Sequence, residues 1–550
     1  MRTQHTSLYE SIHAQVITTA ISKSHVVPPC TQVGSVAVES PCTPKDRKWI
    51  LIATILGSSL AFMDGSVVNI ALPTLQAKFQ ATAGGIQWVV QSYALFSAAL
   101  LLLGGAIGDR YGRRRIFLSG IAVFALASAT CAVSVSLGQL IASRALQGIG
   151  GAMLIPQGLS ILSASFPSEQ RGRAIGTWSA WTSVFIALGP VAGGWLVQVW
   201  SWRLIFLLNL PVALLVILLA PRIPESHAVS DGGSTLPLDR LGATLATSSF
   251  AAIIYALSFA QQLGWRNPQV AWPLIIGVGL LAAFLRSQQK RRNAMMPLSL
   301  FRIQRFFAAN LLTFLLYGAL GGALYVIPFY LIQVRHYAPA MAGAVFLPLI
   351  ALMFFFSARV GALIPKVGER LLLSVGAILS GAGFAAFTLL DGVHGYFLSI
   401  LPGVLLLGAG MTLAVAPLTN AVMSSVPENE MGVASAVNNA LSRLAGLVAV
   451  SLLSLVLAHG FSTSLGTQIH RSSLPAEARE QMIANQGRLH DIPIPAGLTQ
   501  QQGTEAALLL DQAFLSGFRL VMLTCAIGAW LGAVAVFVLL RKSASTKLPG

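Results

Sequence analysis

Residues 105–114 read GAIGDRYGRR, and a similar string, GALIPKVGER, occupies residues 361–370. Each string ends a long apolar run and begins a basic turn. Four positions are identical in the two strings: Gly105 and Gly361, Ala106 and Ala362, Gly112 and Gly368, and Arg114 and Arg370. The copies lie 256 residues apart, more than the about 200 residues that six membrane spans and their loops need. The repeat therefore predicts two related helical bundles with room for two extra helices between them.

The composition outside this repeat is that of a membrane protein. The chain has 550 residues, of which 55% are hydrophobic and 10% charged, and its mean hydropathy is +0.73. A soluble domain carries about 25% charged residues. The apolar residues come in runs of about 20, the length that crosses the hydrocarbon core as a helix. We therefore predict an all-α polytopic membrane protein and exclude a transmembrane barrel, whose strands alternate over about ten residues.

Fourteen apolar runs stand between charged or Pro/Gly-rich breaks. They cover residues 49–72, 86–107, 115–135, 138–163, 173–198, 203–221, 239–260, 270–288, 306–332, 340–365, 371–391, 396–424, 432–458 and 515–540. These runs predict a cytoplasmic tail (1–48), a six-helix bundle (49–221), a linker with two inserted helices (222–305), a second six-helix bundle (306–541) and a short tail (542–550). No cleavable signal peptide precedes the first run, so we expect that run to direct insertion.

Basic residues gather on one side of these fourteen spans. They are Lys45, Arg47, Lys48, Arg110, Arg113, Arg114, Arg115, Arg171, Arg173, Arg286, Lys290, Arg291, Arg292, Arg302, Arg305, Lys366, Arg370, Arg541, Lys542 and Lys547. The positive-inside rule places that side and both termini in the cytoplasm of a cell-membrane protein. The net charge of +17 is explained by these loops, so we exclude nucleic acid as a partner.

The polar segment 459–514 separates the last two spans and is expected on the outer side. Its stretch LPAEAREQMIANQG could form a short surface helix, but a solvated connector is favoured. Whether an outer channel or adaptor protein binds here is left open by the sequence.

Four strings carry a family resemblance. GAIGDRYGRRRIFL (105–118) resembles the loop between helices 2 and 3 of the major facilitator superfamily, and RALQGIGGAMLIPQ (144–157) resembles its helix 4. ALGPVAGG (187–194) and MDGSVVNIALP (63–73) are similar to helices 5 and 1 of the fourteen-helix drug:proton antiporter branch. The resemblance covers residues 45–541 and implies two six-helix bundles plus two inserted helices, with export driven by protons.

Asp64 is the acid that stands out in the first half of the chain. An ionised aspartate in the middle of a membrane helix costs about 2.5–3.5 kcal/mol on insertion scales. Such an acid is a candidate proton carrier, and an anchor bonded to a neighbouring helix is the alternative. Arg144 lies a few residues into its own apolar run. The resemblance implies that Arg144 takes part in proton transfer, where its fixed charge would lower the pKa of a nearby acid and tune proton release by Asp64. Snorkelling to the interface is the alternative.

The signature around 105–114 is interpreted as a conformational latch. The resemblance implies that Asp109 pairs with a neighbouring helix end and so holds one of two states. The latch residues are Gly105, Asp109, Arg110, Gly112, Arg113 and Arg114. The helix-5 signature implies a tightly packed antiporter seam, formed by Gly176, Gly189, Pro190, Gly193 and Gly194. Phe185 stands where this signature usually has a glycine.

Aromatic and polar residues near these signatures are candidates for substrate contact. Trp178, Trp181 and Phe185 recur at helical spacing and could stack on flat lipophilic cations, although packing or lipid contact is favoured. Asn69 and Gln157 are further candidates. The polar residues Asn310, Asn438, Asn439 and Arg443 carry no individual assignment.

The function expected from these observations is proton-coupled efflux of lipophilic or amphiphilic small molecules by alternating access. No phosphate-binding loop, metal-ligand spacing or nucleophile elbow is present, so we expect no enzyme activity, no cofactor and no metal. The expected partners are a small-molecule substrate, protons and the lipid bilayer. The alternatives are a dedicated exporter of one metabolite, lipid or siderophore, a transport-dead sensor, and a proton-coupled importer.

Overall fold

The computed structural model describes residues 44–81, 83–225, 239–290, 294, 296–337, 339–389, 396–427, 430–486, 492, 494–495 and 497–540. Every regular element in these residues is helical. Thirteen helices are long and apolar enough to cross a membrane, and one bent pair adds a fourteenth span. The fourteen spans predicted from the apolar runs are therefore confirmed within the described part of the chain.

The first bundle contains six spans. Its helices are α2 (Pro44–Phe79), α3 (Ala83–Ala99), α4 (Leu101–Tyr111), α5 (Arg113–Ala132), α6 (Leu137–Ser165), α7 (Ser168–Val199), α8 (Arg203–Leu207) and α9 (Asn209–Leu219). The chain bends by 46° between α3 and α4, which together make one span. Short helix α8 continues into α9, and residues Arg203–Arg222 make another span.

Two inserted helices follow, α10 (Arg240–Leu263) and α11 (Pro268–Lys290). Asp239 starts α10 by accepting a hydrogen bond from the backbone N–H of Gly242 at 2.9 Å. Helix α10 packs against both α3 and α18. The hydroxyl of Ser451 in α18 donates to the carbonyl of Leu257 at 3.1 Å. The insertion is thus packed against both bundles.

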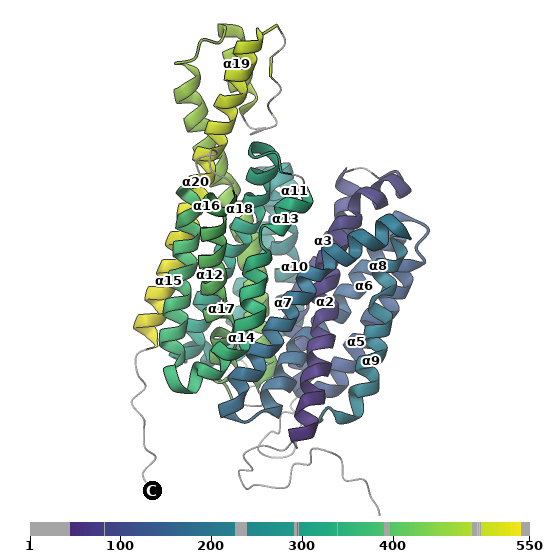
Figure 1. Ribbon diagram of the computed structural model, residues 1–550. Helices are drawn as coiled ribbons and strands as arrows, with labels where there is room; N and C mark the ends of the chain where they lie inside the picture. Colours follow the sequence, from purple (N-terminus) through teal and green to yellow (C-terminus); the bar gives the residue numbers. More distant parts are fainter. Residues whose placement is uncertain are drawn as a thin grey trace, which may run out of the picture.

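The second bundle repeats the arrangement of the first (Figure 1). Its helices are α12 (Gln304–Phe329), α13 (Pro339–Ala344), α14 (Leu347–Val367), α15 (Glu369–Ala386), α16 (Tyr396–Ser399), α17 (Leu401–Met423), α18 (Met431–Ile469), α19 (Ala476–Ala484) and α20 (Gln500–Leu539). Three short turns of other helix types, Ala220–Arg222, Leu298–Arg302 and Phe387–Leu389, and a π-turn at Tyr330–Val334 complete the described elements.

The repeated glycines explain why the two halves turn alike. Gly112 separates α4 from α5 with φ +107°, and Gly368 separates α14 from α15 with φ +83°. Residues with a Cβ rarely adopt positive φ, so a glycine at each break lets the chain reverse within one residue. The sequence repeat at 105–114 and 361–370 therefore marks the same backbone turn in each bundle.

The solvated connector favoured for 459–514 is wrong for most of the described residues there. Helix α18 continues to Ile469, α19 covers Ala476–Ala484, and α20 begins at Gln500, well before the predicted residue 515. Thr499 caps α20 in a reciprocal pair with Gln502. Figure 1 shows that these helix ends and α19 project beyond the bundle. Helix α19 lies within LPAEAREQMIANQG, so the alternative of a short surface helix describes this stretch. The apolar runs did not predict the extended ends of α18 and α20, because these ends lie outside the runs.

Candidate transport site

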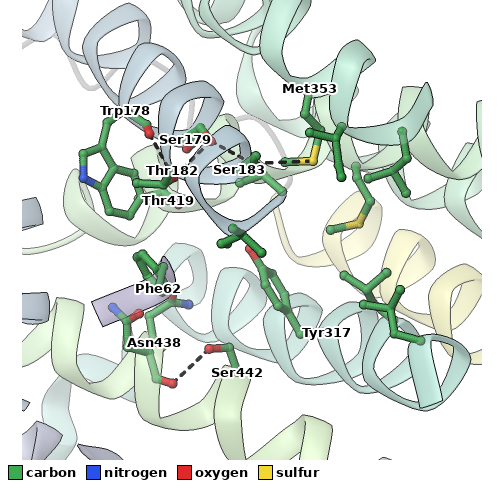
Figure 2. A pocket seen from close by; sticks show the side chains of 18 of the residues that line it. Phe62, Trp178, Ser179, Thr182, Ser183, Tyr317, Met353, Thr419, Asn438 and Ser442 are labelled. Atoms are coloured by element: carbon green, nitrogen blue, oxygen red, sulfur yellow. Dashed lines mark hydrogen bonds between the residues drawn. The ribbon is translucent and has the colours of Figure 1, made fainter. Parts of the chain in front are cut away.

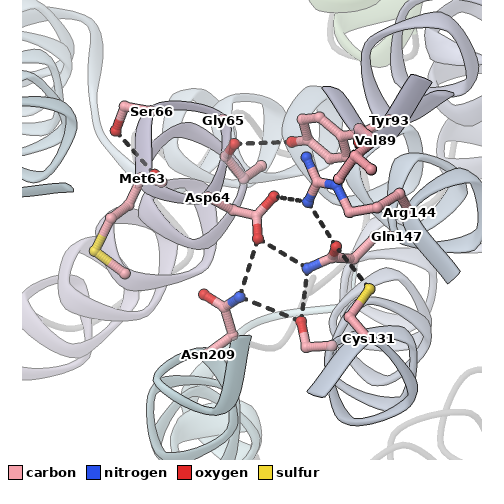
Figure 3. A network of polar contacts seen from close by, with 12 residues as sticks. Met63, Asp64, Gly65, Ser66, Val89, Tyr93, Cys131, Arg144, Gln147 and Asn209 are labelled. Atoms are coloured by element: carbon pink, nitrogen blue, oxygen red, sulfur yellow. Dashed lines mark hydrogen bonds and ion pairs between the residues drawn. The ribbon is translucent and has the colours of Figure 1, made fainter. Parts of the chain in front are cut away.

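Asp64 lies inside the first bundle in a closed polar network (Figure 3). Its side chain on α2 is 1% exposed and forms an ion pair with Arg144 of α6. The other carboxylate oxygen accepts hydrogen bonds from Gln147 at 2.9 Å and from Asn209 at 3.2 Å. The partners of Asp64 come from two other helices, Arg144 and Gln147 from α6 and Asn209 from α9, so the network exists only in the folded protein.

Arg144 is held from several directions. Its Nε donates to the carbonyl of Val89 at 3.0 Å, and its guanidinium donates to Gln147 Oε1 at 2.7 Å. The guanidinium also lies 4.5 Å from the centre of the Tyr93 ring. Arg144 is fully buried, so the alternative of a side chain snorkelling to the interface does not describe its position. Removing either member of such a buried pair leaves an uncompensated charge.

Three members of this network, Gln147, Ser128 and Asn209, were not singled out as site residues from the sequence, although Gln147 belongs to the helix-4 signature. Ser128 of α5 accepts hydrogen bonds from Gln147 at 2.7 Å and from Asn209 at 3.2 Å. Asn209 is a lone amide in the apolar run 203–221. This isolated polar residue was the sequence signal that could have identified it as a site residue. Asn69, by contrast, is exposed and donates to the carbonyl of Gly65 one turn back.

The glycines of the α7 signature pack against the helix that carries Asp64. A Cβ at Gly189 would overlap the hydroxyl of Ser66, and one at Gly193 would come within 3.1 Å of Val67. Ser66 also donates to the carbonyl of Ile186 at 3.0 Å. Pro190 and Gly194 belong to the same stretch of α7. Helices α2 and α7 therefore touch backbone to backbone beside the polar network.

Gly176 belongs to a different contact from Gly189 and Gly193. It lies against the backbone of Ser357 in α14, and Gly172 lies against Gly361 of the same helix. The glycine that opens the repeat in the second bundle thus meets α7 of the first. These contacts join the two bundles near the basic end, by which we mean the loops at 110–115, 169–173 and 366–370.

Asp109 joins the bundles at the basic end as well. Its carboxylate accepts hydrogen bonds from the backbone N–H groups of Gly432 at 3.0 Å and Val433 at 2.9 Å, in the first turn of α18. Arg113 donates to the same carboxylate at 2.9 Å. A Cβ at Gly105 would collide with Gly432, so this glycine permits the approach of α18. A carboxylate at a helix N-terminus is stabilised by the unpaired N–H groups there.

The remaining latch residues surround this contact. Arg110 lies 5.4 Å from the centre of the Tyr111 ring, and Arg114 is half-buried. Gly112 forms the turn described above. In the second bundle Pro365 occupies the position equivalent to Asp109, and Glu369 instead binds Arg305 at 2.6 Å and Asn420 at 2.6 Å. The repeat is therefore chemically unequal: the carboxylate of the first copy binds the other bundle, and the carboxylate of the second copy pairs within its own bundle.

A cavity of about 390 Å³ lies between the two bundles on the side of these contacts away from the basic end (Figure 2). Its lining residues come from both halves: Phe62, Leu159, Trp178, Ser179, Thr182, Ser183, Ile186, Tyr317, Leu320, Leu324, Phe346, Leu349, Ile350, Met353, Met411, Val415, Thr419, Asn438, Asn439 and Ser442. Along α7, Gly172 and Gly176 precede Trp178, Thr182 and Ile186. The interbundle contacts therefore close the cavity toward the basic end.

The aromatic candidates of α7 do not share one environment. Trp178 lines the cavity, is 8% exposed, and donates from its indole to Ser58 at 3.2 Å. Trp181 is 43% exposed and packs on Phe354, with ring centres 5.2 Å apart, while Phe185 is half-buried beside it. Gln157 donates to the carbonyl of Gly104 at 2.9 Å, within the first bundle. Of the sequence candidates for substrate contact, Trp178 is the one placed on the cavity wall among the described residues.

Two bundles related by a sequence repeat, with a cavity between them, are the architecture of a transporter. A family model described as Major Facilitator Superfamily matches residues 54–450. The chain belongs to this superfamily. The resemblance drawn from the four signatures is thereby confirmed, and membership identifies an integral membrane transporter that acts on small molecules.

Characterised relatives of this superfamily member are resistance and efflux proteins. The chain is 32% identical to the multidrug resistance protein Stp of Mycobacterium tuberculosis over 79% of its own length and 80% of that protein. It is 29% identical to the tetracenomycin C resistance and export protein of Streptomyces glaucescens over 91% of its length and 93% of that protein. Kinship of this extent supports drug efflux as the general activity.

Solved structures agree on the fold. The human organic anion transporter MFSD10 matches with a TM-score of 0.57 at 15% identity, covering 90% of this chain and 100% of that one. The proton:xylose symporter XylE matches with a TM-score of 0.53 at 14% identity, covering 89% of this chain and 95% of that one. At these identities the likeness concerns the fold alone.

Proposed function

We propose that this protein exports lipophilic or amphiphilic small molecules in exchange for protons, by alternating access. Asp64 carries the proton, and Arg144 sets how readily the carboxylate releases it. The observation that carries the proposal is the placement of two neighbours on α2. Phe62 lies on the cavity wall, and Asp64, two residues later, lies in the sealed network of the first bundle.

The network gives protonation a mechanical consequence. Protonated Asp64 loses its ion pair with Arg144, while Arg144 keeps its bonds to Val89 and Gln147. The strongest tie between α2 and α6 is then weakened. Because Asp64 is buried, proton entry requires the bundle to open at this point. Protonation and helix movement are thus coupled by the cost of burying an unpaired charge.

Substrate and proton occupy separate places in this arrangement. Asp64 is not among the residues that line the cavity, so the two do not compete for one carboxylate in this state. The cavity and Asp64 are coupled instead through α2, which carries both Phe62 and Asp64. They are also coupled through the contact of Gly189 on α7 with Ser66 on α2, because α7 carries the cavity residues Trp178 and Thr182.

The membrane orientation follows from the charge distribution. Placing the basic end in the cytoplasm, as the positive-inside rule directs, makes this state one whose cavity is shut toward the cytoplasm. A cysteine at the exposed position Gln501 should then react with an impermeant maleimide from outside intact cells. A cysteine at the exposed position Lys366 should react only after permeabilisation. The reverse pattern would overturn this orientation.

Export is tested in everted membrane vesicles that hold an imposed pH gradient. We expect at least one compound of a panel of chloramphenicol, novobiocin and ethidium, added to vesicles with the wild-type protein, to release protons that a quenched acridine dye reports. Asp64→Asn should abolish this release. Asp239→Asn, which alters a buried carboxylate at the start of α10, is the matched control and should retain it.

The outcomes separate the parts of the proposal. Proton release that is equal in wild type and Asp64→Asn would refute the coupling role of Asp64. No release with any compound, from vesicles in which the protein is folded, would refute multidrug exchange and favour a dedicated exporter or a sensor.

A further inference from the structure

We propose that the central cavity selects uncharged aromatic molecules that carry hydroxyl or amide hydrogens, and discriminates against lipophilic cations. This inference rests on the proposed function, because it names the substrate class of the same cavity. It is carried by the charges, hydrogen bonds and ring positions of the lining residues.

The wall of the cavity carries no charge. None of its twenty described lining residues is an aspartate, glutamate, lysine, arginine or histidine. Three carboxylates outside the wall are already paired: Asp64 with Arg144, Asp109 with the first turn of α18, and Glu369 with Arg305. A cationic ligand therefore meets no carboxylate on this wall, although burying a charge is costly without a counter-ion.

Arg443 adds positive charge next to this wall. It follows Asn439 by one helical turn on α18, and Asn439 lines the cavity. Ala440, three residues before Arg443 on α18, lies in the same apolar cluster as Tyr93 of α3 in the first bundle. Arg443 thus lies between the bundles, where its field repels a cation that enters the cavity and tolerates a neutral molecule.

Three hydroxyl groups of the wall present acceptors rather than donors, whereas the buried hydroxyl of Ser179 has no partner among the described residues and can donate or accept. Thr182, Ser183 and Ser442 each donate their single proton to a backbone carbonyl of their own helix, at 2.8 to 2.9 Å. Each oxygen retains lone pairs that can accept a hydrogen bond. A ligand recognised by these oxygens must bring its own O–H or N–H hydrogens.

Asn438 presents an acceptor in the same way. Its amide nitrogen donates to Asn310 at 3.2 Å and to Thr313 at 2.7 Å, which uses both of its hydrogens. The carbonyl oxygen of the side chain then remains to accept from a ligand. Tyr317 adds a phenol on the wall that can both donate and accept.

The remaining wall favours a flat ring system. Phe62 and Trp178 lie edge to face, with ring centres 6.3 Å apart and planes at 71°. Figure 2 shows Tyr317 reaching into the cavity from another helix. Cation–π attraction to such rings is a modest gain for a cation. That gain is smaller than the cost of burying a charge beside Arg443 without a carboxylate, so the neutral ring system is preferred.

Three probes with one ring system test this selection. They are 1-hydroxypyrene, its methyl ether 1-methoxypyrene, and trimethyl(pyrenylmethyl)ammonium. Binding to purified protein in detergent is followed by energy transfer from tryptophan to pyrene, with no ion gradient present. We expect hydroxypyrene to bind about tenfold more tightly than either of the other two, since a lost hydrogen bond is worth about 1 kcal/mol or more.

The double variant Thr182→Val/Ser183→Ala should lower the affinity for hydroxypyrene about tenfold and leave that for methoxypyrene unchanged. Thr177→Val is the matched control, because Thr177 lies on the same helix and donates to a backbone carbonyl in the same way but does not line the cavity. Ser442→Ala, on α18, makes the same comparison if the double variant fails to fold.

Equal affinity for the phenol and its ether, or tighter binding of the ammonium probe, would overturn the inference. So would the absence of binding by any probe. Export is judged separately, because proton release in vesicles by ethidium alone would uphold the exchange mechanism while refuting this selectivity.

Discussion

Asp109 accepts a hydrogen bond from the backbone N–H of Val433 at 2.9 Å, across 324 residues of sequence. The carboxylate belongs to the first bundle, and the helix end belongs to the second. Charge-assisted hydrogen bonds of this kind contribute about 1.5–3 kcal/mol. A contact of that size can set the balance between a closed and an open basic end.

Replacing Asp109 with alanine is therefore expected to open the basic end. Spin labels at the exposed positions Arg115 and Lys366 report the separation of the bundles there. We expect the population at the longer distance to rise by about tenfold or more relative to the closed one, by the energy of the lost bonds. Asp239→Asn, at a helix start inside the insertion, should leave the distances unchanged. Unchanged distances in Asp109→Ala would show that the Asp109 contact does not stabilise the closed state.

Gly172→Val tests the second contact between the bundles. A Cβ at Gly172 collides with the backbone of Gly361, which cannot move aside as a flexible side chain can. We expect this substitution to separate α7 from α14 and lengthen the same spin-label distance. Gly138→Val is the control, since a Cβ there meets open space. A closed basic end in Gly172→Val would contradict the packing described for this contact.

The ion pair of Asp64 and Arg144 makes a prediction about stability. Arg144→Gln leaves a buried carboxylate without its partner and should destabilise the protein by about 3–5 kcal/mol. Asp64→Asn/Arg144→Gln removes both charges and should recover a large part of that loss. Thermal unfolding in detergent at neutral pH measures the comparison. A double variant as unstable as Arg144→Gln would mean that the charges do not act as a pair.

Glu430 gives the basic end a pH dependence. Partial burial, and next the charge of Asp109, raise the pKa of the Glu430 carboxyl above its ordinary value of 4.5. An acid with a raised pKa in the closed state stabilises that state below its ordinary pKa, and the contribution is lost as pH rises through the raised value. Lowering the pH toward 4.5 should therefore favour the short spin-label distance. Glu430→Gln should flatten this dependence, and a dependence that survives the substitution would assign it to another group.

The sequence repeat was informative because it encodes a backbone turn. Gly112 and Gly368 both adopt positive φ, which few other residues tolerate, so the repeat was visible without coordinates. Asp64 and Arg144 could also be recognised without coordinates, because a charged side chain in an apolar membrane span is costly whatever its partners are. Their pairing with each other was not visible, because 80 residues separate them.

Other elements escaped the sequence because their roles depend on what lies across an interface. Asn209 and Ser128 are unremarkable polar residues until α9 and α5 bring them to the carboxylate of Asp64. In the sequence, Gly176 belongs to the same signature as Gly189. In the structure, Gly176 contacts α14, whereas Gly189 contacts α2. The long ends of α18 and α20 lie outside the apolar runs, so hydropathy did not predict them. Helix α19 does lie in the stretch LPAEAREQMIANQG that the sequence offered as a possible surface helix.

The amino-acid sequence alone indicated a helical membrane protein in two related halves, with fourteen apolar runs and with its basic residues gathered in the loops that this topology puts on one side. Those features follow from local chemistry: the length of apolar runs, the placement of charges and the glycines at turns. Only the tertiary structure decided that the buried carboxylate and the cavity are separate, and that the cavity wall is uncharged. These are relations between helices, and their reason is packing, because which face of each helix meets another depends on all of its neighbours at once.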